Sequence, residues 1–304
     1  MQSVLAMLVL CSALLPAALF AQQAPLLTEY TAPKETTVLT TTSVDWDSIL
    51  PHDTEYGQRR DVFDNPTTTL DKLEVHITTL NPGKESQSPH YHAWEEIMLI
   101  KDGTFDISIN GKIQRAVPGD VVFLASNASH NAKNVGATPA SYYVINFISD
   151  LANSSEAKSA TEQTLPGKMA STIIHTDSMT RIPSRRGWQI MVYNSPTRTI
   201  ESLESHITTL NPGQQTAVDM VDSNDEVVIV KSGDVECLVN GVASRMHAGA
   251  IMFWSPMVKR TLRNLGPVPT TYEVFRATTA RSIHPTIPPQ QPAPPSSQQP
   301  AQPR

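Results

Sequence analysis

The sequence predicts an all-β protein that contains two copies of one domain. The decapeptide EVHITTLNPG at residues 74–83 returns as ESHITTLNPG at residues 204–213. Short apolar runs are separated by turn residues every 8 to 12 positions, and no long helical pattern lies between them. This combination is typical of a duplicated β-sandwich or β-barrel.

The repeat holds at a constant offset of 130 residues over most of the chain. The offset places these residues opposite one another: Gly57 and Gly187, Gly103 and Gly233, Asn134 and Asn264. A period this long, present twice, indicates a duplicated domain and not a solenoid. We therefore expect one unit at 38–150 and a second at 168–281, joined by a polar linker at 151–167.

The strands of each unit show in the local pattern. Residues 104–109 alternate polar and apolar and end at Asn110-Gly111, a strong hairpin signal. Residues 121–124 and 142–145 are further β-rich runs. In the second unit Cys237 takes the place of a core isoleucine, so we expect a buried, inert thiol.

The two ends of the chain differ from its centre. Residues 1–21 read as a secretory signal peptide with cleavage after Ala21, which would send the protein to the periplasm or outside the cell with no membrane span left after cleavage. An uncleaved membrane anchor is the alternative. Residues 282–304 hold eight of the 24 prolines among Gln, Ser and Ala, and we expect a disordered, Pro-rich tail.

Composition excludes several functional classes. The formal net charge is −6, and no Lys/Arg cluster is present, which argues against a nucleic-acid partner. Two cysteines rule out a disulfide scaffold and any Cys-rich zinc or iron–sulfur site.

One cluster of residues in the first unit carries metal chemistry. His90 and His92 stand at i and i+2, so on an extended strand they point to the same face. Glu96 follows four residues later, and His130 lies downstream. Three imidazoles and one carboxylate that converge inside a barrel make a divalent metal site with open positions.

These residues resemble both motifs of the cupin superfamily. His90-x-His92-x3-Glu96-x6-Gly103 fits the first motif, with a preceding Gly83 one residue further away than usual. Pro118-Gly119 followed by His130-x3-Asn134 fits the second. The resemblance covers nearly all of 38–281. It implies two tandem double-stranded β-helix (jelly-roll) barrels, with His90, His92, Glu96 and His130 as ligands of Mn or Fe, or else of Zn or Ni.

Several neighbouring residues receive structural interpretations. His76 and His206 recur in both units, so we expect structural roles for them, and Asn134 should support the loop near His130. Glu95 should face away from Glu96, because adjacent strand residues point to opposite sides. Trp94 either walls the pocket, fills the core or is exposed. The remaining histidines have no ligand partners at motif spacing: His52, His175, His247 and His284.

The second unit has lost most of the ligand set. The offset carries the four positions to other residues: His90 to Met220, His92 to Asp222, Glu96 to Glu226 and His130 to Arg260. A fixed cation repels a divalent metal and pairs well with carboxylates. Our hypothesis is that Arg260 replaces the metal by pairing with Asp222, Glu226 or both, and the alternative is that these side chains lie on exposed loops and do not meet.

The resemblance favours an enzyme on a small substrate that carries a carboxylate or carbonyl group, as a dioxygenase, decarboxylase, isomerase or aminohydrolase. A metal-dependent small-ligand-binding module and a storage-like double barrel are the alternatives. Arg59-Arg60 could meet an anionic substrate or form a solvated surface pair. A homo-oligomer is a further expectation.

Overall fold

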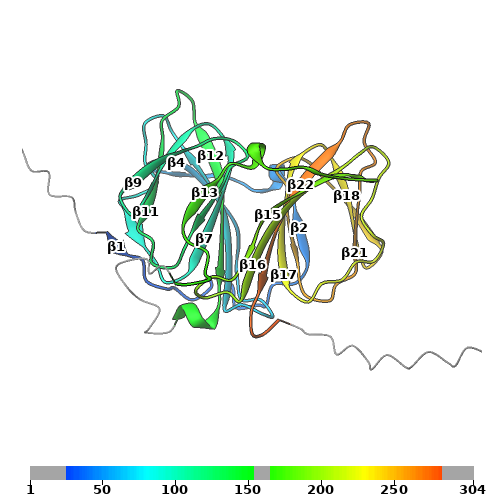
Figure 1. The fold of residues 1–304 in the computed structure, drawn as a ribbon, viewed down its shortest axis with the longest axis horizontal. Coiled ribbons are helices and arrows are strands. Elements are labelled where there is room, and N and C mark those ends of the chain that lie inside the picture. The colour runs from blue at the N-terminus through cyan, green and yellow to red at the C-terminus, as the bar shows by residue number, and fades with distance from the viewer. Residues whose placement is uncertain (1–24, 154–164, 283–304) are drawn as a thin grey trace, which may run out of the picture.

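Two β-barrels lie side by side in the computed structural model of the chain (Figure 1). The structure describes residues 25–153 and 165–282. The predicted signal peptide, His284 and nearly all of the predicted Pro-rich tail lie outside these ranges. Within the described part of the chain, no helix is both long and apolar enough to cross a bilayer.

Described residues 25–153, which include the first repeat, supply twelve strands and two short 3₁₀ helices. Their bounds are β1 (Leu26–Leu27), β2 (Thr42–Val44), η1 (Trp46–Ser48), β3 (His52–Thr54), β4 (Gly57–Asn65), β5 (Lys72–Leu80), β6 (His90–Tyr91), β7 (Glu95–Asp102), β8 (Phe105–Ile109), β9 (Lys112–Ala116), β10 (Val121–Leu124), β11 (His130–Asn134), β12 (Ala140–Ile148) and η2 (Asp150–Asn153).

The second repeat follows the same order. Its bounds are β13 (Thr172–Ile174), η3 (Thr176–Ser178), β14 (Ile182–Ser184), β15 (Gly187–Ser195), β16 (Ser202–Leu210), β17 (Asp225–Ser232), β18 (Val235–Val239), β19 (Val242–Met246), β20 (Ile251–Trp254), β21 (Arg260–Arg263) and β22 (Thr270–Thr278).

Each barrel is formed by a larger and a smaller sheet. Barrel 1 combines the seven-stranded sheet β13-β10-β7-β12-β5-β4-β3 with the five-stranded sheet β1-β6-β11-β8-β9. Barrel 2 combines the seven-stranded sheet β14-β15-β16-β22-β17-β20-β2 with the three-stranded sheet β19-β18-β21. The predicted all-β class with two tandem jelly-roll barrels is confirmed.

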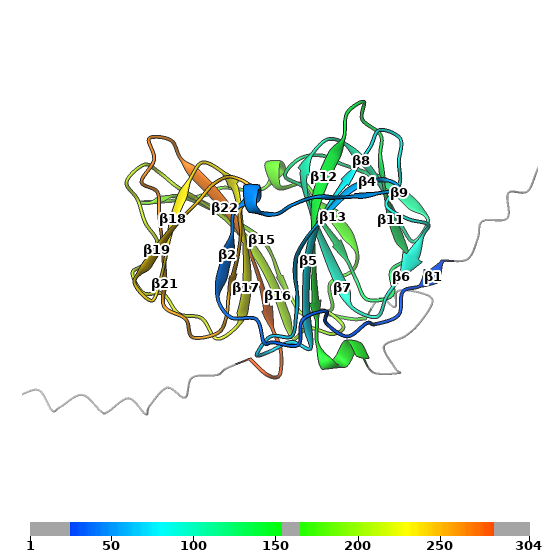
Figure 2. The same ribbon diagram turned by 180° about the vertical axis from the view of Figure 1, so that it is seen from behind.

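The two barrels exchange a strand. β2 belongs to the first repeat but pairs with β20 of barrel 2, and β13 belongs to the second repeat but pairs with β10 of barrel 1 (Figure 2). The registers match through the repeat, because Thr42 lies opposite Phe253 and Thr172 lies opposite Phe123. Each barrel therefore contains a strand from the other repeat.

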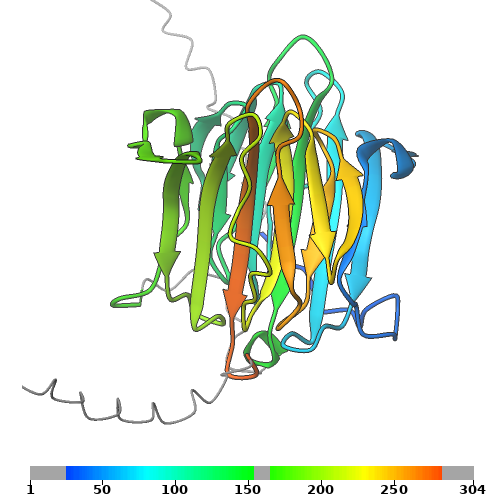
Figure 3. The ribbon, with the colours of Figure 1, turned by 90° about the vertical axis from the view of Figure 1, so that its right-hand side faces the viewer.

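The seven-stranded sheets pack face to face, with the strands of both barrels running along the same direction in Figure 3. One apolar cluster joins them, and the ring centroids of Phe63 and Phe253 are 6.3 Å apart in it. Buried carboxylates cross the interface in both directions. Glu95 accepts the backbone N–H and the hydroxyl of Thr199, while Asp225 accepts the hydroxyls of Thr67 and Thr69.

The predicted hairpin turn and a motif glycine have clear backbone reasons. Asn110 and Gly111 have φ of 49° and 79°, the left-handed pair of a type I′ turn, and Asn240 repeats the value at 48°. Gly103 has φ of 80°, and a Cβ there would lie 2.2 Å from the Ala140 Cβ. The first cupin motif ends on this glycine because β12 passes too close for any side chain.

Candidate metal centre

The four predicted ligands come from both sheets of barrel 1: from β6 and β11 of the smaller sheet, from β7 of the larger one and from the loop that joins β6 to β7. His90 on β6 lies directly opposite His130 on β11 in the strand register. His92 follows β6, and Glu96 is the second residue of β7. Strand alternation aims Glu96 into the barrel together with Met98, while Glu95 faces barrel 2, as predicted.

The three imidazoles form a compact cluster. One nitrogen from each of His90, His92 and His130 lies within 4.8 Å of the others, and all three residues are buried. Glu96 completes the group, with a carboxylate oxygen 3.4 Å from His92 Nε2 and the other 3.8 Å from His130 Nε2. The structure thus brings together all four residues that the motif spacing singles out.

Backbone carbonyls fix the orientation of two imidazoles. His92 Nδ1 lies 2.8 Å from the carbonyl oxygen of Trp94, and His130 Nδ1 lies 2.8 Å from that of Ala128. Each Nδ1 must carry its proton to donate, which leaves the Nε2 lone pair free. Both Nε2 atoms are buried and have no hydrogen-bond partner among the described residues. This is the arrangement of imidazoles that bind a metal through Nε2.

Trp94 holds the His92 ring from one side. The two rings stack with their centroids 4.4 Å apart and an interplanar angle of 1°. Trp94 itself packs against Ile148 and Ala152. It therefore acts as core filling beneath a ligand and does not wall the cavity.

Gln87 is a neighbour of the site that the sequence patterns do not single out. Its side-chain amide nitrogen lies 2.8 Å from His90 Nδ1. It also lines the cavity of barrel 1. The only signal in the sequence is its place three residues before the first ligand.

Burial and mutual charge set the protonation of the cluster. Burial lowers the pKa of His130 to about 3, and burial also lowers the pKa of His90. For Glu96 burial alone would raise the pKa, but the surrounding imidazoles outweigh it and lower the pKa to about 2. His90 and His130 are thus neutral and Glu96 is ionised at pH 7, the states that metal ligands need.

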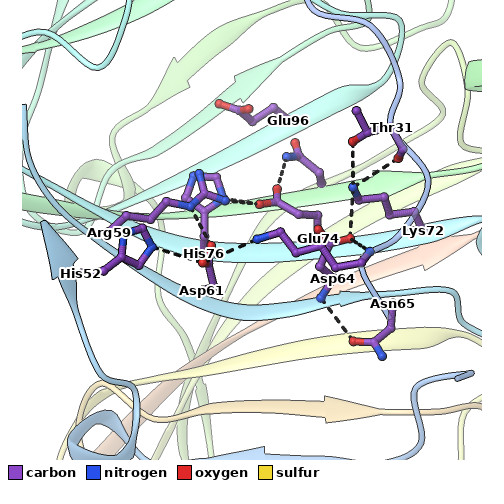
Figure 4. A network of polar contacts seen from close by, with 12 residues as sticks. Thr31, His52, Arg59, Asp61, Asp64, Asn65, Lys72, Glu74, His76 and Glu96 are labelled. Carbon is purple, nitrogen blue, oxygen red and sulfur yellow. Dashed lines mark hydrogen bonds and ion pairs between the residues drawn. The ribbon is translucent and has the colours of Figure 1, made fainter. Parts of the chain in front are cut away.

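A cavity of about 280 Å³ opens beside the cluster. It is lined by His90, Glu96 and His130 and by residues of β4, β5 and β12, including Arg59, His76 and Tyr142. Arg59 Nη2 donates to Glu74 at 2.7 Å, and His76 Nδ1 contacts the same carboxylate oxygen at 2.6 Å (Figure 4). Glu96 lies apart from this network in the same view. The network places one guanidinium at the wall of the cavity.

The two adjacent arginines have different surroundings. Arg59 lines the cavity, and its Nε also donates to Asp61 at 2.7 Å. Arg60 donates instead to the carbonyl oxygen of Ile49 and lies over the Trp46 ring. Of the pair, Arg59 is the residue that could meet an anionic substrate.

Asn134 supports the loop that follows β11. Its amide donates to the carbonyl oxygens of Leu80 and Thr138, both at 2.8 Å, and its oxygen accepts the N–H of Gly136. Asn264 makes the equivalent three bonds in barrel 2. The predicted structural role is confirmed, because the contacts are the same where the ligands are lost.

Residues given no functional role lie away from the cluster. His52, His175 and His247 contact Asp61, Asp120 and Asp45 respectively. Cys237 is fully buried, and burial raises the pKa of its thiol to about 11. The core assignment of this cysteine is confirmed.

In barrel 2 two arginines occupy the centre. Arg260 on β21 is buried and donates to Glu226, while Asp222 pairs with Arg276 at 3.2 Å. Arg276 on β22 also donates to Glu226 at 2.6 Å and to Glu204 at 3.1 Å. Arg260 thus pairs with one of the two predicted carboxylates, and a second arginine takes the other.

Comparison with known proteins assigns the class. Residues 76–146 match the model of the cupin domain family, and this segment contains all four predicted ligands. The first unit therefore contains a cupin domain, and the pair of barrels has the bicupin fold. No match was found among curated protein sequences.

Solved structures with the same fold include two-domain enzymes. A putative glyoxylate-induced protein from Pseudomonas aeruginosa is similar with a TM-score of 0.63 and 13% identity, over 86% of this chain and 100% of that one. The oxalate decarboxylase of Lactobacillus farciminis, in a formate complex, is similar with a TM-score of 0.60 and 13% identity, over 82% of this chain and 89% of that one. Bacillus subtilis oxalate decarboxylase, which has Mn(II) centres, is similar with a TM-score of 0.59 and 14% identity, over 80% of this chain and 79% of that one. At these identities the likeness shows the fold.

Proposed function

We propose that barrel 1 binds one divalent metal ion through His90, His92, His130 and Glu96. The observation that carries this proposal is the pair of buried, unpartnered Nε2 atoms on His92 and His130, among the described residues, beside an ionised carboxylate. A buried polar atom without a partner costs about 1–3 kcal/mol. A bound cation would satisfy both nitrogens at once. The Mn(II) centres of the similar decarboxylase make Mn(II) the first ion to test, ahead of Fe(II), Zn(II) and Ni(II).

We further propose that the protein is an enzyme on a small acid or carbonyl compound. A cavity of about 280 Å³ is near the lower limit for small-molecule sites, which favours a substrate of few atoms. Arg59 at the cavity wall offers a guanidinium to a carboxylate group. Oxalate and glyoxylate, which occur in the names of the similar proteins, are the first candidates.

The metal ligands, Arg59 and the apolar side chains of the cavity have different proposed roles. When bound, the metal would polarise a carbonyl or carboxylate oxygen, or activate water or O₂. Arg59, held by Glu74 and Asp61, would orient the acid end of the substrate. Met98, Leu124 and Val144 line the cavity with apolar surface and limit the water around the reacting group.

Export to the periplasm or outside the cell, after removal of residues 1–21, remains part of the proposal. Assembly into a homo-oligomer does too. The apolar segment at 4–21 supports export. Mass spectrometry of the N-terminus of the protein after expression from its own first codon tests it, and a mature chain that begins at Gln22 is the expected result.

The decisive experiment measures metal and turnover together. The purified protein is loaded with Mn(II), Fe(II) or Zn(II), dialysed, analysed for metal and assayed with oxalate and glyoxylate for CO₂ release and O₂ uptake. We expect one equivalent of metal and turnover, and His92→Ala should lose both. His247→Ala, an exposed histidine that pairs with Asp45 outside the site, is the matched control and should keep both.

The other outcomes separate the competing functions. If the protein binds the metal and the acid but does not turn the acid over, its function is that of a binding module and not of an enzyme. A protein without bound metal after loading would overturn the metal site itself.

A further inference from the structure

Barrel 2 encloses the larger cavity of the two, about 460 Å³ against 280 Å³. It occupies the same place as the metal-site cavity of barrel 1, because its wall includes all four positions that correspond to ligands there, Met220, Asp222, Glu226 and Arg260. A volume of this size is typical of sites that bind small organic molecules.

Arginines outnumber carboxylates on the wall of this cavity. Four arginines line it, Arg185, Arg186, Arg260 and Arg276, against the two carboxylates of Asp222 and Glu226. Glu204 pairs with Arg276 behind the wall. Arg185 is exposed to solvent, so the other three arginines and the three carboxylates balance in number. The three carboxylates all pair with Arg260 or Arg276. A half-enclosed charge is costly unless it is paired, so the half-buried Arg186, which has no ion pair among the described residues, favours an anionic occupant.

Arg260 has a donor left over. Its Nη2 is taken by Glu226, and its Nη1 lies 3.4 Å from the carbonyl oxygen of Val258. Its Nε is buried and has no hydrogen-bond partner among the described residues, and the side chain is only 4% exposed. The guanidinium lies over Trp254, with 4.8 Å from Cζ to the ring centroid.

Arg186 adds a second group near the mouth of the cavity. No ion pair forms between it and any described residue. Its neighbours Arg185 and Val221 are exposed, so the cavity is open to solvent on this side. Deeper in, Trp254, Leu262 and Val274 supply apolar wall.

From this arrangement we infer that barrel 2 binds a small organic carboxylate without a metal. The carboxylate lies between Arg186 and the free Nε of Arg260, and the apolar body of the ligand contacts Leu262 and Val274. The inference does not rest on the metal site of barrel 1, because every group it uses belongs to barrel 2.

Calorimetric titration of the full-length, chelator-treated protein with benzoate tests the inference, with benzamide as the neutral analogue of the same shape. We expect one saturable benzoate site per chain and at least about tenfold weaker binding of benzamide, as expected for loss of a charge-assisted hydrogen bond. Inorganic phosphate, titrated in parallel, should bind more weakly because it gains nothing from the apolar wall.

Variants locate the site. Arg186→Met and Arg260→Lys should each weaken benzoate binding by about tenfold. Arg245→Met, an exposed arginine of the same barrel outside this cavity, and Arg59→Met in barrel 1 should leave it within about twofold.

Arg186 makes no ion pair to a described residue, so its loss should not disturb folding even if the Arg260 variant does. Equal binding of benzamide and benzoate, no saturable binding of benzoate up to about 10 mM, a loss of binding in Arg59→Met, or unchanged binding in Arg186→Met would each overturn the inference.

Discussion

The two barrels share one backbone plan and differ at its centre. Barrel 1 places three imidazoles around Glu96, and two of their nitrogens have no partner among the described residues. Barrel 2 surrounds the equivalent Glu226 with two guanidinium groups. In both barrels a largely buried glutamate lies at the centre, and a buried carboxylate is stable only beside hydrogen-bond donors or positive charge. The comparison teaches that the scaffold accommodates either a cluster of imidazoles or fixed cations beside this carboxylate.

The surrounding framework has changed far less than the centre. The β-bulge between Asp61 and Phe63 recurs between Met191 and Tyr193 at the same offset of 130. The loop contacts of Asn134 recur at Asn264. Because bulges and loop supports determine where the strands point, the same inward positions remain available for different chemistry.

The sharpest way to break the comparison is to rebuild the metal site in barrel 2. The triple variant Met220→His, Asp222→His, Arg260→His restores the ligand types of barrel 1, but Arg276 still pairs with Glu226. We expect no second metal equivalent in this variant. Adding Arg276→Asn, which copies Asn146 of barrel 1, should give a second equivalent of Mn(II) by elemental analysis after dialysis.

This pair of variants isolates the role of Arg276. The carbonyl of Val258, which corresponds to the one that orients His130, is already present to receive the new imidazole. A second metal in the triple variant alone would show that Arg276 does not compete for Glu226, and the contrast between the barrels would then rest on Arg260.

Removing the central carboxylate of barrel 2 is the next largest effect. Glu226→Gln leaves buried Arg260 without its ion-pair partner, and we expect a loss of roughly 3–5 kcal/mol in the free energy of unfolding. The double variant Glu226→Gln, Arg260→Met removes both charges and should return to within about 1 kcal/mol of the parent. Urea unfolding of the chelator-treated proteins measures both. A double variant as unstable as the single one would mean that the arginine packs the core and does not merely balance charge.

Much of the fold could be predicted because the same strand and turn patterns occur twice in the sequence, at a constant offset. The alternation of 104–109, the Asn110-Gly111 turn and the matching Asn240 each occur at the positions that the structure uses. The exchange of β2 and β13 could not be predicted. Each has three residues, and the two edges that they extend, β10 and β20, are equivalent strands of the two repeats, so local pattern does not decide between them.

The site, like the fold, could be predicted only in part. Motif spacing predicted which four side chains of barrel 1 meet, because strands β6, β7 and β11 and the short loop after β6 fix their geometry. Arg276 was missed, since the comparison of the repeats stopped at the ligand positions, although the same offset sets Asn146 opposite Arg276. Gln87 follows no period or motif, and only the packing of its loop brings it to His90.

The smallest expected effect is a pH-dependent loss of stability when the carboxylate behind each cavity, Glu74 or Glu204, is removed. Burial would raise the pKa of Glu74, but His76, Arg59 and Asn146 outweigh it and lower the pKa to about 2 from an ordinary value of 4.5. A carboxyl whose pKa is lowered by folding stabilises the protein above about pH 4.5, and that stability is lost as the pH falls toward 2. Glu74→Gln should therefore cost about 3 kcal/mol at pH 7 and progressively less between pH 4.5 and pH 2.

The matching change in barrel 2, Glu204→Gln, should show the same pH trend with a smaller amplitude. The pKa of Glu204 is lowered first by its hydrogen bond with His206 and further by Arg276, but Arg276 is also shared with Glu226 and Asp222. Urea unfolding of both variants and the parent, in chelator from pH 7 to pH 3, gives the two curves. A loss at Glu204 equal to or larger than that at Glu74, or a loss that does not shrink as the pH falls, would contradict the assignment of these carboxylates as the ionised anchors of the cavity arginines.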